Sequence, residues 1–323
     1  MKSVQGGGVA VTGSVAYDHI MNFTGKFKDH ILPDKLHILN VSFLVDGLKR
    51  LRGGCAANIG HALSLHGLRP RLVAAVGSDF DEYRRWLEAR NFDLAGTKVH
   101  QDLLTASCFI TTDRDNNQIT GFYPGAMGRA AEVTIAGLPG PKPQLVVVSP
   151  NDPAAMKAVP EECRKLGVPF AYDPGQQVIA LSGDDLKKGL QGAKLLFTND
   201  YELAMVQQKT GLDLEGLQER VEIVVTTLGE QGSRVHARGE APVEIPVAAV
   251  KGVVDPTGAG DAYRGGFIKG LLAGADWATC GRLGALTASY CVESHGTNNY
   301  TFDDAAFGRR FAEAFGMAAA RSL

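Results

Sequence analysis

The seven residues Asp255-Pro256-Thr257-Gly258-Ala259-Gly260-Asp261 carry the strongest chemical signal in the chain. Apolar side chains recur every four residues from Tyr263 to Leu271, which predicts a helix that begins within the glycines. The free backbone N–H groups at 258–260 would then converge and form an anion hole. Such a hole suits phosphoryl transfer, because Asp261 can accept a hydroxyl proton while the amides hold the developing charge. An ordinary glycine-rich turn is the alternative.

A second cluster is Arg52-Gly53-Gly54-Cys55-Ala56-Ala57-Asn58, a double-glycine turn that leads into an apolar segment. The Asn58 amide and exposed backbone amides suit a substrate that carries several hydroxyl groups. An ordinary helix start with Asn58 on the solvent side is an equal alternative.

A third cluster, Asn199-Asp200-Tyr201-Glu202, follows a buried apolar run. Ligands of α/β proteins bind at such strand ends, and Mg²⁺ keeps much of its water shell, so Asn199 and Glu202 could hold Mg²⁺ through water. A helix capping box has the same residue pattern and remains the alternative.

Short apolar runs alternate with helix-length segments along most of the chain, and several runs are apolar on both faces. This alternation predicts βαβ units, and therefore one α/β domain over residues 1–323 with a mostly parallel sheet between helices. The predicted strands are 9–15, 71–76, 145–149, 170–173, 194–198 and 221–228. The predicted helices are 56–68, 79–89, 152–166, 184–191, 200–210, 258–273, 277–293 and 303–321.

Two segments interrupt this rhythm. Leu39, Val41, Phe43 and Val45 alternate with their neighbours, which predicts a half-buried strand. Residues 107–112 and 118–122 flank a turn-rich segment and predict a hairpin. Together they predict a small β-sheet lid, inserted by the segments at about 20–50 and 105–125.

The composition narrows the class of protein. Acidic and basic residues nearly cancel, at 35 against 33, so no nucleic-acid surface is expected. No run of about 18 apolar residues occurs, so no membrane partner is expected. The five cysteines are scattered, which predicts reduced thiols and no zinc site. Asp18 and His19 break the first apolar stretch, so no secretory signal is expected. Together these features predict a cytoplasmic location.

Other ligand-binding classes can be weighed against the same residues. The Walker motif G-x-x-x-x-G-K-[ST] is missing, and Gly6-Gly7-Gly8 precedes the first predicted strand, unlike the glycines of a Rossmann dehydrogenase. A catalytically inactive sugar- or nucleotide-binding module stays open, although binding alone would not require Asp261. Turnover of ATP with a panel of substrates separates a module from an enzyme.

The motifs Gly53-Gly54-x-x-x-Asn58, Asn199-x-x-Glu202 and residues 255–261, in this order, resemble the ribokinase-like (PfkB) family of sugar and nucleoside kinases. The resemblance runs from about Val9 to beyond Gly296 and implies a ribokinase-like α/β fold. It implies that Asp261 is the catalytic base, with Gly258, Ala259 and Gly260 as the anion hole. Implied substrate contacts are Asp18, Gly54 and Asn58. Implied ATP contacts are Asn199, Thr227, Gly229, Gly232 and Gly260, with Asn199 and Glu202 serving Mg²⁺.

Further stretches resemble bacterial adenosine kinases of this family, among them Val41-Ser42-Phe43-Leu44-Val45-Asp46 and Asp173-Pro174-Gly175-Gln176-Gln177. This implies a nucleoside pocket lined by Ser14, Asp18, Ser42, Phe122, Gln176 and Gln177. Phe122 in the lid core and Gln176 as a helix cap are the structural alternatives. Cys108 departs from the pattern, because an aromatic residue is expected to stack on the base there. Phe109 belongs to the opposite face of its strand and cannot replace it.

The resemblance implies Mg²⁺- and ATP-dependent phosphorylation of the 5′-hydroxyl of adenosine, giving AMP and ADP, in purine salvage. Another ribonucleoside or a free sugar such as ribose or fructose is the alternative acceptor, and a monovalent cation is a further candidate cofactor. The apolar face at Leu39–Val45 and the paired lids of the family predict a homodimer through the lid. The helix dipole is expected to hold the pKa of Asp261 low.

Overall fold

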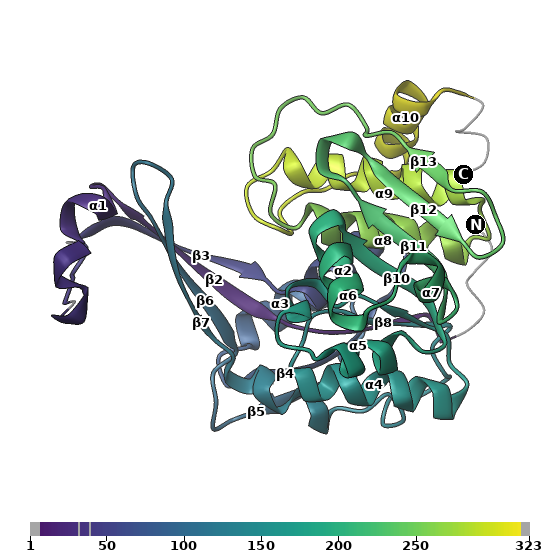
Figure 1. The fold of residues 1–323 in the computed structure, drawn as a ribbon, viewed down its shortest axis with the longest axis horizontal. Coiled ribbons are helices and arrows are strands. Elements are labelled where there is room, and N and C mark those ends of the chain that lie inside the picture. The colour runs from purple at the N-terminus through teal and green to yellow at the C-terminus, as the bar shows by residue number, and fades with distance from the viewer. Residues whose placement is uncertain (1–6, 32, 39, 318–323) are drawn as a thin grey trace.

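The apolar runs of the sequence form one large sheet, sheet A, in a computed structural model of the chain (Figure 1). The structure describes residues 7–31, 33–38 and 40–317. Within them, nine strands lie in the order β13-β12-β11-β10-β9-β8-β1-β4-β5. All neighbours from β11 to β5 pair in parallel, while β12 and β13 are antiparallel additions at one edge. The predicted mostly parallel sheet is confirmed.

The elements have the following bounds. The strands of sheet A are β1 (Val9–Thr12), β4 (Arg71–Gly77), β5 (Thr97–His100), β8 (Leu145–Val148), β9 (Phe170–Tyr172), β10 (Ala193–Asn199), β11 (Val221–Thr227), β12 (Ser233–Ala237) and β13 (Val243–Ile245). The α-helices are α1 (Phe27–His30), α2 (Cys55–Leu65), α3 (Asp81–Glu88), α4 (Pro153–Leu166), α5 (Gly183–Leu190), α6 (Asp200–Thr210), α7 (Leu214–Gln218), α8 (Ala259–Leu272), α9 (Trp277–Val292) and α10 (Asp304–Phe315). Short 3₁₀ turns are η1 (Pro33–Ile38), η2 (Gly125–Glu132), η3 (Gly175–Val178) and η4 (Gly229–Gln231).

Helices cover both faces of sheet A, and the alternation of side chains along β1 shows how. Val9 and Val11 enter one apolar cluster, to which α2, α3, α8 and α9 contribute. Ala10 points the other way, into a cluster with α4, α5 and α6. Successive strand side chains lie on opposite faces, so an all-apolar strand requires a helical layer on each side.

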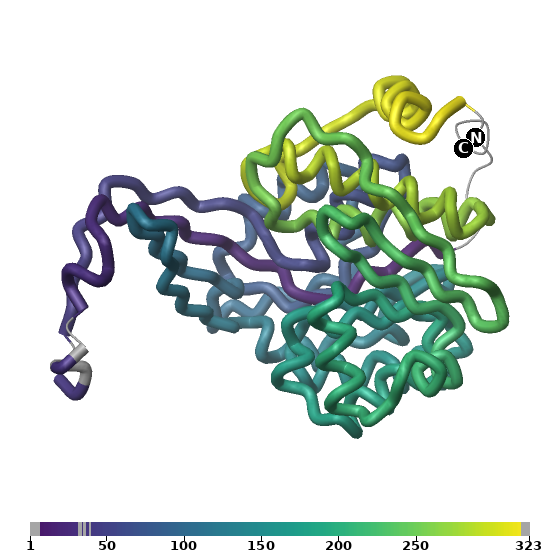
Figure 2. The backbone as a smooth tube through the Cα atoms, turned by 45° about the horizontal axis from the view of Figure 1, so that its top comes forward, coloured from purple at the N-terminus to yellow at the C-terminus, as the bar shows by residue number. Residues whose placement is uncertain are grey.

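A second sheet, sheet B, contains the strands β3 (Val45–Gly53), β2 (Ala16–Phe23), β6 (Ala106–Thr112) and β7 (Gln118–Tyr123), in that order. In both views it stands away from the body as an arm, with α1 at its far end (Figure 1, Figure 2). The predicted hairpin is confirmed as β6 and β7, and the predicted lid corresponds to sheet B.

The prediction of a strand over 39–45 was wrong. Residues 40–44 have no regular structure and β3 begins at Val45, while Leu39 lies outside the described residues. Phe43 packs at the tip of the arm instead, with its ring 4.8 Å from that of Phe23 and 5.0 Å from that of Phe27. The last helix ends at Phe315, and residues 318–321 of the prediction lie outside the described part.

In the part of the chain that the structure describes, no helix is both long enough and apolar enough to cross a membrane.

Candidate active site

A cavity of about 860 Å³ lies at the carboxyl ends of the parallel strands, against the base of sheet B. Ser14 follows β1 there, Asp173 follows β9, and Asn199 and Thr227 end β10 and β11. This edge is where open α/β sheets bind ligands. The predicted residues that line the cavity are Ser14, Asp18, Gly54, Asn58, Phe122, Gln176, Gln177, Asn199, Glu202, Thr227, Gly229, Gly258, Gly260 and Asp261.

Three predicted site residues are not among those that line the cavity. Ser42 is exposed in the irregular segment of the arm. Gly232 has a φ of +91° before β12, and a Cβ there would lie 2.0 Å from the carbonyl oxygen of Ile245, so this glycine serves the turn. The amide of Ala259 donates to the carbonyl of Pro256 (3.3 Å), which leaves the amides of Gly258 and Gly260 as the better donors to an anion.

The predicted glycine-rich helix start is present. Gly258 caps α8 with a φ of +82°, a left-handed conformation that glycine adopts without steric cost. The first N–H groups of a helix lack intrahelical acceptors and carry partial positive charge, so they face the cavity as an anion site. Asp261 lies in the first turn of the same helix, which places its carboxylate beside that site.

Replacing Gly258 with Ala is expected to destabilise the protein. The left-handed conformation strains any other residue, and a Cβ would lie 2.8 Å from the Thr297 Cβ. A loss of about 1–3 kcal/mol in unfolding free energy is expected from urea titration. Gly252→Ala is the matched control, because nothing lies within 4 Å of its added Cβ. Equal stability of the two variants would contradict the strained turn.

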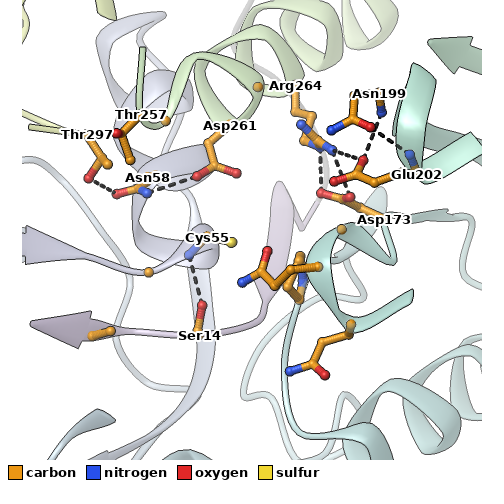
Figure 3. A pocket seen from close by; sticks show the side chains of 18 of the residues that line it. Ser14, Cys55, Asn58, Asp173, Asn199, Glu202, Thr257, Asp261, Arg264 and Thr297 are labelled. Atoms are coloured by element: carbon orange, nitrogen blue, oxygen red, sulfur yellow. Dashed lines mark hydrogen bonds and ion pairs between the residues drawn. The ribbon is translucent and has the colours of Figure 1, made fainter. Parts of the chain in front are cut away.

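A buried amide holds Asp261 in place (Figure 3). Asn58, from α2, donates its Nδ2 to the Asp261 Oδ2 at 2.9 Å. The Oδ1 of Asn58 accepts bonds from the Thr297 hydroxyl (2.8 Å) and the Asn298 amide (3.2 Å), so the amide has only one orientation. Asn58 lines the cavity, and its role in substrate binding stays a prediction. The structure adds its contact with Asp261.

The expectation of a low pKa for Asp261 was wrong. Burial raises the pKa of this carboxyl, although the Arg264 guanidinium and the Asn58 amide act in the opposite direction. Removal from water penalises the charged form, and this effect outweighs the opposing contributions of Arg264 and Asn58. Asp261 is therefore a stronger base than an exposed aspartate.

Asp18 faces the cavity from β2. Gly53, on the neighbouring strand β3, pairs with Ala16, two residues from Asp18. A Cβ on Gly53 would come within 2.4 Å of the Asp18 Oδ2, so the glycine makes room for the carboxylate. Burial, with a smaller contribution from Asp255, raises the pKa of Asp18 to about 6.

Asp18, Cys108 and Phe122 form one row across sheet B. Asp18 pairs with Cys108 across β2 and β6, and Cys108 pairs with Phe122 across β6 and β7. All three line the cavity, so the thiol lies between the carboxylate and the aromatic ring. Phe109 lies on the other face and stacks on His19 at 4.7 Å, as the strand alternation predicts.

Asn199 and Glu202 form the capping box of α6. The Asn199 Oδ1 accepts a hydrogen bond from the backbone N–H of Glu202 (2.7 Å). The Glu202 Oε2 accepts one from the backbone N–H of Asn199 (2.8 Å). In the described part of the chain, the Glu202 Oε1 makes no hydrogen bond and stays available to a hydrated cation. The described residues contain no group of three His, Cys, Asp or Glu side chains that would hold a metal by themselves.

Asp173 and Arg264 are among the cavity residues that were not predicted from the sequence. Asp173 follows the buried strand β9 and Arg264 lies three residues after Asp261 in α8. A charged residue inside the otherwise apolar segment Tyr263–Phe267 was the signal that could have identified Arg264.

Comparisons with known proteins agree with this geometry. The model of the pfkB family of carbohydrate kinases matches residues 11–304. A nucleoside kinase of Methanothermobacter thermautotrophicus is 33% identical over 307 residues, 94% of this chain and 95% of that protein.

Solved structures show the same likeness. A nucleoside kinase of Burkholderia thailandensis in complex with inosine superimposes with a TM-score of 0.85 at 37% identity, over 95% of this chain and 98% of that one. The same enzyme with ADP-inosine gives 0.83 at 38% identity, over 95% and 96% of the two chains. A ribokinase of Thermotoga maritima at 20% identity shares the fold with a TM-score of 0.76, covering 95% and 99%. The fold is therefore ribokinase-like, as predicted.

Proposed function

The chain belongs to the pfkB family of carbohydrate kinases, and from this premise we propose that it transfers the γ-phosphoryl group of ATP to the 5′-hydroxyl of adenosine. The likeness to nucleoside kinases along nearly the whole chain supports a phosphotransferase that acts on a nucleoside. The products are AMP and ADP.

The row Asp18–Cys108–Phe122 is the observation that carries the nucleoside proposal. Asp18 can accept hydrogen bonds from ribose hydroxyls, as the resemblance implies. Two strand spacings separate it from Phe122, roughly 10 Å, which is enough for a ribose followed by a base. Phe122 offers an aromatic face to that base. A free sugar would leave this part of the cavity without a partner.

The reaction follows from the position of Asp261. The 5′-hydroxyl oxygen attacks the γ-phosphorus while the Asp261 carboxylate takes its proton. The bond between the γ-phosphorus and the β,γ-bridging oxygen breaks, and its electron pair leaves with ADP. The amides of Gly258 and Gly260 stabilise the charge on the transferred group.

The charges of the cavity fit a bound Mg²⁺. Among the described residues, five carboxylates line it, those of Asp18, Asp173, Asp200, Glu202 and Asp261, against one cation, Arg264. A nucleotide with several negative charges would be repelled there without a counterion. The free Oε1 of Glu202 and the Asn199 segment would hold the ion through water, as Mg²⁺ prefers. When bound, Mg²⁺ neutralises phosphate charge.

A second acceptor, inosine, is favoured by one observation, the inosine complex of the Burkholderia kinase. Gln176 and Gln177 both line the cavity. A glutamine amide carries a donor and an acceptor, so it can pair with the edge of adenine or of hypoxanthine.

Rates of phosphate transfer from ATP, compared across adenosine, inosine, guanosine, ribose and fructose, test the function. Adenosine is expected to give the highest kcat/KM. A higher value for inosine would overturn only the choice of base. A higher value for ribose or fructose would overturn the nucleoside, and no transfer to any acceptor would indicate a binding module.

Nucleoside affinity is expected to fall in acid. The pKa of Asp18 is raised to about 6, so its carboxylate is present above that pH and is lost as the pH falls through it. A protonated carboxyl accepts fewer hydrogen bonds, so Kd should rise by about tenfold between pH 7.5 and pH 5. Calorimetric titration with nucleoside in the absence of ATP measures it. Asp18→Asn should bind weakly with no such dependence, and an identical slope in this variant would refute the assignment.

We also propose a homodimer formed through sheet B. Its outer face, which points away from the cavity, carries Leu48 (65% exposed), Phe109 (45%), Ile119 (44%) and Tyr123 (41%). The pairing of the strands puts these side chains on one face. Such a patch on an arm with open strand edges favours a second copy.

Sedimentation at micromolar concentration is expected to give twice the chain mass of 34.3 kDa. Leu48→Lys together with Ile119→Lys should shift the protein to the monomer. Lys49→Glu is the control, because residue 49 lies on the other face of β3. A monomeric wild-type protein would exclude the dimer.

A further inference from the structure

A buried arginine lies beside the anion hole, and the reaction above does not use it. Arg264 is only 7% exposed although it carries a full charge. It follows Asp261 by one helical turn, and helix side chains lean toward the helix N-terminus. Its guanidinium therefore reaches back to the end of α8 that forms the anion hole.

Asp173 fixes the guanidinium in one orientation (Figure 3). The Arg264 Nη2 donates to the Asp173 Oδ1 at 2.8 Å, and its Nε lies 2.5 Å from the Asp173 Oδ2. Glu202 lies 3.8 Å from the same Nη2. One hydrogen bond from Nη2 and one close ion-pair contact at Nε therefore hold the guanidinium against this carboxylate.

The third guanidinium nitrogen, Nη1, is not part of these contacts with Asp173 and Glu202. A Cβ on Gly260 would lie 2.6 Å from the Arg264 Nη1, so this nitrogen occupies the space that the missing side chain leaves. No described residue accepts a hydrogen bond from Nη1. Arg264 nevertheless lines the cavity, which leaves the Nη1 edge directed to whatever the anion hole binds.

The electrostatics of the cavity agree with such a role. Arg264 is the one cation among the described residues that line the cavity, beside five carboxylates. Asp173 and Glu202 balance its charge from one side. An anion at the amides of Gly258 and Gly260 would meet the other side, where a hydrogen bond to a charged group is stronger than a neutral one.

We propose that Arg264 donates from Nη1 to the phosphoryl group in transfer, and that Asp173 positions it for this contact. This inference rests on the proposed phosphotransfer function. Arg264 is then a catalytic residue that acts with the amides of α8, and Asp173 is a positioning residue.

The test compares Arg264→Met and Arg264→Lys with the wild-type enzyme. Loss of one charge-assisted hydrogen bond to the transferred group is expected to lower kcat on the order of 10- to 100-fold in Arg264→Met. Arg264→Lys keeps a charge near Asp173, so it should fold and lose less kcat than Arg264→Met. Some loss should remain, because lysine lacks the planar fork of donors. Nucleoside Kd, measured by calorimetry without ATP, should stay within about twofold, since Arg264 is proposed to contact phosphate.

Two further measurements separate this contact from a merely structural role. Guanidinium ion at low millimolar concentration should restore part of the kcat of Arg264→Ala, and should not help Asp261→Asn. Asp173→Asn should lower kcat less than Arg264→Met, and should have no further effect in the Arg264→Met background, because Asp173 acts through the arginine.

Arg71→Lys is the control for loss of a buried guanidinium, since Arg71 is 6% exposed and lies outside the cavity. It should change the melting temperature without changing kcat. The inference would be overturned if Arg264→Met kept the kcat of the wild-type enzyme, or if it lost only nucleoside binding. Turnover by the wild-type enzyme would still support the proposed function in that case. Failure of the wild-type enzyme to transfer phosphate would instead overturn the proposed function.

Discussion

Asp261→Asn is expected to lower kcat by about 10²- to 10⁴-fold, which is the usual cost of removing a general base. The new amide has the shape of the carboxylate, and its oxygen can still accept the bond that Asn58 donates to Asp261 at 2.9 Å. The side chain therefore stays oriented while it loses the ability to take the 5′-hydroxyl proton. Steady-state kinetics with saturating ATP measures the effect.

The pattern of the loss is as informative as its size. In the proposed binding mode the nucleoside contacts the cavity around Asp18 and Phe122, so KM should move little while kcat falls. Asp304→Asn, an exposed change in α10, is the control and should be neutral. A near-normal kcat for Asp261→Asn would refute the mechanism.

Asp18→Ala is expected to lower kcat/KM for the nucleoside on the order of 10²- to 10⁴-fold. A carboxylate that accepts two ribose hydroxyls makes two charge-assisted hydrogen bonds, each with a contribution of roughly 1.5–3 kcal/mol. Burial of Asp18 strengthens both bonds. Most of the loss should appear as a higher KM, in contrast to Asp261→Asn, because the contact already exists in the bound ground state.

The matched control for Asp18 is its neighbour in the same strand. His19 points to the outer face of sheet B and stacks on Phe109, so His19→Gln should keep nucleoside affinity. A similar loss in both variants would mean that the changes disturb β2 rather than a substrate contact.

Much of this protein follows from local patterns in its sequence. The strands of sheet A from β11 to β4 were predicted because burial on both faces requires continuous apolar runs. Such a run can be recognised in the sequence without knowing which strands pair with it. The glycine-rich start of α8 was predicted because it depends on backbone geometry at a few neighbouring residues. The strand alternation also placed Cys108 and Phe109 on opposite faces correctly.

Sheet B was predicted less well. The alternation of Val41 and Phe43 indicated a strand, yet β3 begins only at Val45 and continues through the charged residues Lys49, Arg50 and Arg52. Charged side chains are common on edge strands, and their pairing with β2 depends on a segment that is distant in sequence. Hydrophobicity alone therefore located the lid but not the position of β3.

The tertiary structure alone decided how the site residues act on one another. Asn58 and Asp261 are 203 positions apart, and Asp173 and Arg264 are 91 apart, so neither contact leaves a pattern in the sequence. The raised pKa of Asp261 has the same origin, because burial by residues from several elements removes water from the carboxylate. Local sequence determines where a helix starts and which residues it presents there. Only the packing of distant segments determines the partners and the dielectric environment of those residues, and hence their chemistry.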